Sequence, residues 1–148
     1  MIVAFFGHAD YVPTVADEEA LLSLLSEVVG DAPCELFLGE YGAFDRFAYR
    51  CAQKYKRHHA GVRLIFVTPY PLEAPRGEVE ECFDGILYPA IEDVPKRYAI
   101  VHRNRFMVEK ADVLIFYVRR HTGGAYKAYR YALSLQKVVY HLANEKKV

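Results

Sequence analysis

Short, nearly continuous apolar runs alternate with amphipathic segments along the whole of this 148-residue chain. Such runs are typical of strands buried on both faces of a sheet, and strands joined by helices pair in parallel with right-handed crossovers. The predicted strands cover residues 2–8, 34–39, 62–69, 84–89, 112–118 and 137–142, and the predicted helices cover 18–30, 44–61, 94–111 and 123–136. We therefore expect a single α/β domain over residues 1–148, a Rossmann-like three-layer sandwich with a mostly parallel central sheet.

The cysteine content and the N-terminus narrow the class of protein. Cys34, Cys51 and Cys82 are odd in number and widely spaced, a pattern that fits neither a disulfide framework nor a zinc site. We expect reduced thiols in a cytoplasmic protein without a bound metal. The apolar run at residues 1–6 is too short for a signal peptide or a membrane span, so no membrane partner is expected.

Charge is unevenly distributed although the formal net charge is zero. Residues 1–40 contain eight acidic groups and no Lys or Arg, whereas residues 96–137 contain ten Lys or Arg and only two acids, Glu109 and Asp112. A basic segment of this kind can contact a nucleic acid, a phosphate ligand or an acidic partner surface. It can equally form a solvated face that balances the acidic half.

Glycines follow several of the predicted strands, where α/β proteins bind their ligands. Gly7 precedes His8, Gly39 and Gly42 bracket the second strand end, and Gly123 and Gly124 follow the fifth strand. Glycine lets a backbone approach a phosphate closely, and the N-terminus of the next helix supplies N–H groups and a partial positive charge. Tight turns also use glycine for steric reasons alone. Two such turns in one domain favour phosphate or nucleotide binding.

Polar and aromatic side chains near these turns are candidate ligand contacts, each with a plain structural alternative. Asp45 could accept hydrogen bonds from a ribose hydroxyl or interact with the helix dipole. Thr122 could cap a helix or bind a phosphate, and His8 could touch a ligand or pack. Tyr70 and Tyr98 could face a base, although aromatic side chains at such places more often pack.

Arg103 falls within the apolar stripe of its predicted helix, beside Ile100 and Met107, with Asn104 on the edge of that stripe. A buried arginine needs a partner. One interpretation is an ion pair with Asp112 or Glu109. The other is a guanidinium that points into a cleft and clamps a phosphate.

Three stretches, "FFGH", "GEYGAFDRFAYRCA" and "RNRFMVEKADVLIFYVRRHTGGAYKA", resemble the SLOG superfamily, which contains the DprA (Smf) proteins and the LOG phosphoribohydrolases. The chain is most similar to its small stand-alone YpsA-like members, and the likeness spans nearly the whole sequence in element order. The resemblance implies a Rossmann-like fold that binds a nucleotide or nucleotide-derived ligand at the glycine turns, commonly as a homo-oligomer, here expected to be a dimer.

The LOG motif is only partly present. LOG enzymes carry an Arg four residues before a Met, then a strand and P-G-G-x-G-T-x-x-E. In this chain Arg103 and Met107 match the first part and Gly123 and Gly124 match the glycine pair, but Lys127 stands in place of the Thr. Tyr126 replaces the third glycine, and Tyr129 and Arg130 stand where the Glu would be.

The missing carboxylate shifts the expected function from hydrolysis to binding. Lys127 suits phosphate binding better than acid–base work, and Asp45 is the carboxylate left to act in catalysis. We expect a binding or sensing module for a mononucleotide or an ADP-ribose-like ligand. The alternatives are an N-glycosidic hydrolase that uses Asp45, and DprA-like nucleic-acid binding through the basic segment.

Overall fold

The computed structural model describes residues 1–39, 42–71 and 83–142, which form one α/β unit. The strands are β1 (Ile2–Gly7), β2 (Cys34–Leu38), β3 (Val62–Val67), β4 (Gly85–Leu87), β5 (Val113–Tyr117) and β6 (Val138–His141). The helices are α1 (Val15–Val28), α2 (Ala43–Lys56), α3 (Ala99–Lys110) and α4 (Gly124–Ser134), with a short 3-10 helix, η2 (Lys96–Tyr98), before α3. All of these elements follow the alternation expected from the sequence.

The six strands form one sheet in the order β4-β3-β2-β1-β5-β6, and every neighbouring pair is parallel. The predicted Rossmann-like fold is confirmed. From β1 the chain moves outward to β2, β3 and β4, and then returns to place β5 on the other side of β1. The strand order therefore reverses between β1 and β5, and a crevice at the carboxyl ends of such a pair is the usual ligand position in open α/β sheets.

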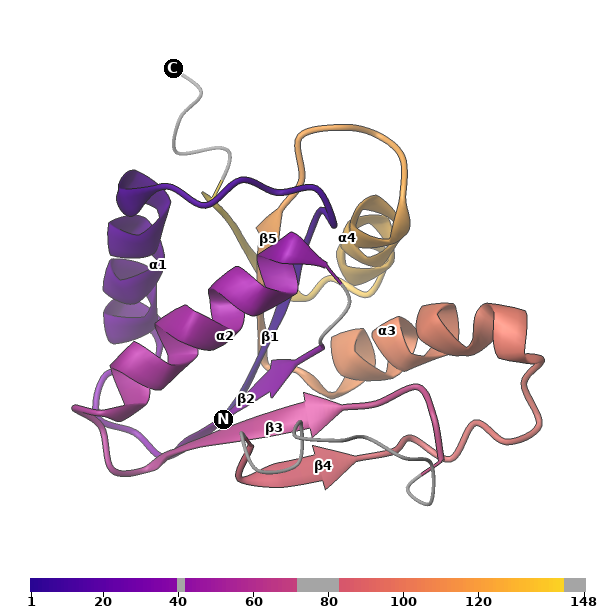
Figure 1. Ribbon diagram of the computed structural model, residues 1–148, viewed down its shortest axis with the longest axis horizontal. Coiled ribbons are helices and arrows are strands. Elements are labelled where there is room, and N and C mark those ends of the chain that lie inside the picture. The colour runs from indigo at the N-terminus through magenta and orange to yellow at the C-terminus, as the bar shows by residue number, and fades with distance from the viewer. Residues whose placement is uncertain (40–41, 72–82, 143–148) are drawn as a thin grey trace.

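Helices cover both faces of the sheet, as Figure 1 shows. Side chains of α1 and α2 pack with Val3, Phe5 and Ile115 in one apolar cluster. Side chains of α3 and α4 pack with Ala4, Phe6 and Phe116 in a second cluster on the opposite face. Alternate residues of a strand point to opposite faces, so β1 and β5 contribute to both cores and must be apolar throughout.

Two helix starts differ from the sequence-based expectation. α1 begins at Val15 rather than at residue 18, because Oγ1 of Thr14 accepts a hydrogen bond from the backbone N–H of Asp17 (3.0 Å) and caps the helix. The helix expected over 94–111 opens as the single 3-10 turn η2, and α3 proper starts at Ala99.

Some of the sequence-based expectations concern residues outside the described ranges. Cys34 and Cys51 are buried free thiols, and Cys82 lies outside the described residues. Residues 72–82 and 143–148 also lie outside them. Among the helices of the described part, none is both long and apolar enough to cross a membrane.

Candidate ligand-binding site

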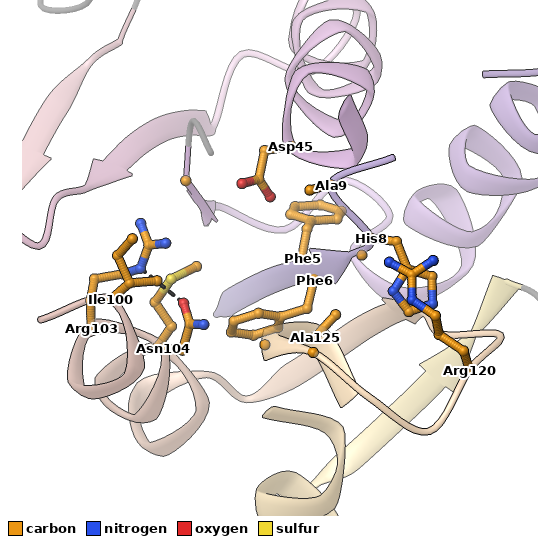
Figure 2. A pocket seen from close by; sticks show the side chains of 15 residues that line it. Phe5, Phe6, His8, Ala9, Asp45, Ile100, Arg103, Asn104, Arg120 and Ala125 are labelled. Carbon is orange, nitrogen blue, oxygen red and sulfur yellow. Dashed lines mark hydrogen bonds between the residues drawn. The ribbon is translucent and has the colours of Figure 1, made fainter. Parts of the chain in front are cut away.

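A cavity of about 210 Å³ opens at the point where the strand order reverses, at the carboxyl ends of β1 and β5. Figure 2 shows side chains from α2, α3 and the segment leading into α4 around this space. The structure brings together seven of the residues selected from the sequence: Gly7, His8, Gly39, Asp45, Arg103, Gly123 and Gly124. Residues about 100 positions apart in the chain thus contribute to one wall.

Arg103 is buried on α3, with 3% of its surface exposed. Its Nη1 donates a hydrogen bond to the carbonyl of Val67 (2.7 Å), and its Nε donates one to Oδ1 of Asn104 (2.9 Å). The two acids considered as ion-pair partners bind elsewhere. Asp112 accepts from the backbone N–H of Ile2, and Glu109 accepts from the hydroxyl of Tyr131. A carbonyl and an amide therefore hold the guanidinium at the cavity wall.

Gly39 makes room for that guanidinium at the end of β2. A Cβ atom at Gly39 would lie 2.9 Å from Nη1 of Arg103, closer than Cβ atoms approach in folded proteins, and 3.2 Å from Nη2. The glycine predicted to approach a phosphate thus approaches the cation that lines the cavity.

The N-terminus of α4 is open toward solvent and the cavity. Gly123, its N-cap, has a φ of 92°, and a Cβ atom placed there would have no heavy atom within 4 Å. The first turn contains no acidic residue. Within the described parts of the chain, the backbone N–H groups of Gly124 and Ala125 donate to no residue. Unsatisfied N–H groups and the helix dipole favour an anion at this position.

The N-terminus of α2 is different, because the loop after β1 occupies it. The N–H of Ala43 donates to the carbonyl of Ala9 (2.9 Å), and the N–H of Phe44 donates to the carbonyl of His8 (3.4 Å). Gly42, with a φ of 134°, lets this loop approach, since its Cβ would lie 2.7 Å from Cα of Ala9. Gly42 therefore has a steric role in the contact between the loop and α2, and it lies outside the cavity lining.

Gly7 has a similar steric role although it also lines the cavity. A Cβ atom there would lie 2.1 Å from the ring of Phe44, so the glycine allows α2 to pack closely on the end of β1.

Asp45 lies in the first turn of α2, half-buried, and lines the cavity. Figure 2 shows its carboxylate in the same space as the side chains of Arg103 and Asn104 on α3. A carboxylate is an acceptor of hydroxyl hydrogens, whereas Arg103 and the α4 N-terminus favour negative charge. The cavity therefore suits a ligand that combines an anionic group with hydroxyls.

His8 is buried and connects the ends of β1 and β5. Its Nε2 accepts a hydrogen bond from the backbone N–H of Arg119 (2.9 Å), and its ring meets that of Tyr117 edge-on. Burial lowers the pKa of His8 below its usual value, and the charge of Arg120 lowers it further. A neutral imidazole with Nε2 as acceptor follows from these contacts.

The remaining sequence-selected residues do not line the cavity. Tyr70 and Tyr98 are exposed, with 40% and 45% of their surfaces accessible. Thr122 is exposed, and Gly123 rather than Thr122 is the N-cap of α4. Lys127 lines a neighbouring groove between α3 and α4, which shares Asn104 and Gly124 with the cavity.

The sequence analysis did not select four polar or small residues of the lining, namely Ala9, Asn104, Arg120 and Ala125. Asn104 positions Arg103, and its place next to a buried arginine was the signal that could have identified it. Arg120 and Ala125 flank the Gly123–Gly124 turn, and Arg120 forms an ion pair with Asp10 at 3.0 Å across the two loops. The described residues contain no cluster of His, Cys, Asp or Glu that could hold a metal ion.

Comparison with known proteins supports the fold. No protein-family model and no curated protein sequence matches the chain. Among solved structures, one of DNA processing protein A from Helicobacter pylori, described for its single-stranded DNA binding mode, matches with a TM-score of 0.69 and 20% identity. The match covers 98% of this chain and 70% of that one. The structural-genomics protein TM1055 matches with a TM-score of 0.57 and 14% identity, over 93% of this chain and 71% of that one. At these identities the likeness shows a shared Rossmann-like fold and nothing finer.

Proposed function

We propose that the protein binds a nucleotide or nucleotide-derived ligand, a mononucleotide or an ADP-ribose-like molecule, as a sensor or binding module. One observation carries the proposal: the buried cation Arg103, the open N-terminus of α4 and the carboxylate of Asp45 meet in one cavity. Phosphate would lie at the Gly123–Gly124 turn, within the field of Arg103. Asp45 would accept hydrogen bonds from ribose hydroxyls.

The experiment is thermal unfolding with AMP, ADP, ATP, cyclic nucleotides, NAD, ADP-ribose and ribose 5-phosphate. A ligand present at about a hundred times its dissociation constant adds roughly 2.7 kcal/mol to the free energy of unfolding. For a domain of this length that raises the midpoint by about 5–10 °C. A panel with no shift would contradict the proposal.

Two conservative variants test which residue contacts the ribose of the ligand and which contacts its phosphate. Asp45→Asn should weaken ligands with a ribose and leave inorganic phosphate binding unchanged. Arg103→Lys keeps a positive charge but lacks the guanidinium fork that holds Val67 and Asn104, so it should weaken all phosphate ligands. Lys110→Ala, an exposed α3 cation outside the cavity lining, is the control and should bind as the wild type does.

An N-glycosidic hydrolase remains the alternative that uses the same pocket. Asp45 would then be the catalytic carboxylate, and free base would accumulate from a nucleoside phosphate on long incubation with the wild type but not with Asp45→Asn. If free base appears only at the uncatalysed rate while the ligand still binds, the hydrolase alternative fails and the binding function stands.

Single-stranded nucleic-acid binding is the second candidate, favoured by the surface of α4. The ring of Tyr126 stacks on His121 at 5.2 Å, and Nη1 of Arg130 donates to the hydroxyl of Tyr126 at 3.0 Å. His121 is exposed and Tyr126 is half-buried. Aromatic side chains beside cations, on which bases can stack, are typical of sequence-tolerant single-strand binding. Binding of an oligonucleotide that weakens steeply with salt and is reduced in Tyr126→Ala would support this candidate.

A further inference from the structure

A second cavity, of about 170 Å³, lies in the groove between α3 and α4, directly beside the first. The two share Asn104 and Gly124 in their linings. Gly124 has no side chain to separate them, and a Cβ atom there would come to 3.8 Å from Nδ2 of Asn104. The two cavities therefore adjoin at Gly124, the first residue of α4.

The walls of the groove differ from those of the first cavity. Val101, Ala128 and Tyr131 give it an apolar floor. The hydroxyl of Tyr131 donates to Glu109, which anchors the end of this side chain. An apolar surface that includes an aromatic ring suits a planar ring system.

Two cations stand at the rim of this floor. Arg105 and Lys127 both line the groove and are exposed, and neither forms an ion pair with any acid in the described ranges. The guanidinium carbon of Arg105 lies 5.8 Å from the centre of the Tyr131 ring. Because these cations have no acidic partner among the described residues, they favour a negatively charged linkage at Gly124, where the two cavities adjoin.

We propose that the groove is a second subsite, and that the ligand is a dinucleotide whose second ring system lies on Val101, Ala128 and Tyr131. Its phosphate linkage crosses Gly124 between the α4 N-terminus and Lys127. This inference rests on the proposed function, because the first half of the ligand occupies the first cavity.

Calorimetry with three probes tests the subsite: AMP, the 5′–5′ linked dinucleotide NAD, and a 3′–5′ linked diadenosine. The second ring gains affinity without a second loss of translational freedom, so at least one dinucleotide should bind about tenfold or more tighter than AMP. Which of the two does so identifies the linkage. Equal affinity of all three probes would overturn the subsite while leaving the first cavity as a nucleotide site. If no probe binds, both the subsite and the proposed function fail.

Variants of the groove test whether the extra affinity of a dinucleotide over AMP arises there. Val101→Phe fills the floor from a partly exposed position on α3, and Arg105→Ala with Lys127→Ala removes the rim charge. Val101→Phe should remove the dinucleotide advantage and leave AMP affinity within about twofold of wild type, and the double rim variant should weaken the dinucleotides more than it weakens AMP. Lys110→Ala is the matched cation control. A dinucleotide advantage that survives Val101→Phe would overturn the assignment of the groove.

Discussion

The guanidinium of Arg103 on α3 lies against the backbone of Gly39 at the end of β2, so close that a Cβ atom at Gly39 would be 2.9 Å from Nη1. The two residues come from elements far apart in the chain, yet each depends on the other. Gly39 leaves the space, and Arg103 fills it with a buried charge held by Val67 and Asn104. This contact sets the position of the cation relative to the cavity.

Gly39→Ala should therefore displace the Arg103 guanidinium and weaken phosphate ligands, because the new methyl group occupies its place. The loss of free energy of unfolding should be about 1–3 kcal/mol, the usual cost of overpacking. Gly85→Ala on β4 is the matched control, since its Cβ would be similarly tight, at 3.1 Å from Ile65, but far from the cavity. Urea unfolding and calorimetry measure both effects. Equal ligand affinity in the two variants would contradict the role of Gly39.

The turn before α4 offers a second pair of matched substitutions. Gly123 has a φ of 92°, so Gly123→Ala should cost about 1–2 kcal/mol in the free energy of unfolding from backbone strain alone, since the position has open space around it. Gly124→Ala meets only an ordinary contact of 3.8 Å with Asn104 and should leave the stability within about 0.5 kcal/mol of wild type. Urea denaturation distinguishes them. Identical stabilities would show that the turn does not need the left-handed conformation.

The parts of this site that the sequence predicted are those set by strand ends. Because parallel strands end at one edge of the sheet, apolar periodicity alone placed Gly7, Gly39 and the Gly123–Gly124 pair on the same side. The buried position of Arg103 followed from its place in the apolar stripe of α3.

The parts that the sequence did not predict depend on long-range contacts and on helix rotation. The carbonyl of Ala9 accepts a hydrogen bond from the N–H of Ala43 at the start of α2. This contact joins a loop to a helix, and no local sequence pattern predicts it. Lys127 lies one turn into α4, and only the rotation of that helix against α3 decides that it faces the groove rather than the cavity. The local sequence predicts neither the contact between the loop and α2 nor the rotation of α4 against α3.

The pKa of His8 leads to a prediction for stability against pH. Burial and the charge of Arg120 lower that pKa in the folded state, so the folded state favours the neutral ring. The unfolded chain binds a proton near pH 6.5, and below this value protonation favours unfolding. The contribution of neutral His8 to the free energy of unfolding should therefore be fully present above about pH 6.5. It should be lost as the pH falls through the lowered pKa of folded His8.

His8→Gln tests this interpretation, because its amide oxygen can accept from the Arg119 N–H in place of Nε2. Urea unfolding between pH 5 and pH 8 should show a smaller loss of stability at the acidic end in the variant than in the wild type. His58→Gln, at the end of α2, is the control for an exposed histidine. Parallel pH curves for wild type and His8→Gln would show that His8 does not carry the dependence.

Asp10 and Arg120 form an exposed ion pair at the cavity wall, with Arg120 Nη1 at 3.0 Å from Oδ1 of Asp10. An exposed ion pair of this kind contributes little to stability, so Asp10→Asn should remain as stable as the wild type. Its effect should appear in binding, because the substitution removes a negative charge from the mouth of the cavity and releases the Arg120 guanidinium toward the ligand. We expect an anionic ligand to bind about two- to fivefold more tightly at low salt, and this gain to fade near 1 M salt as exposed charges are screened.

Asp31→Asn, a substitution of an exposed acid outside the cavity lining, controls for the change in net charge. Calorimetry with inorganic phosphate and AMP at two salt concentrations measures the effect. A weaker ligand in Asp10→Asn would reverse the interpretation, since Asp10 would then hold Arg120 in its binding position.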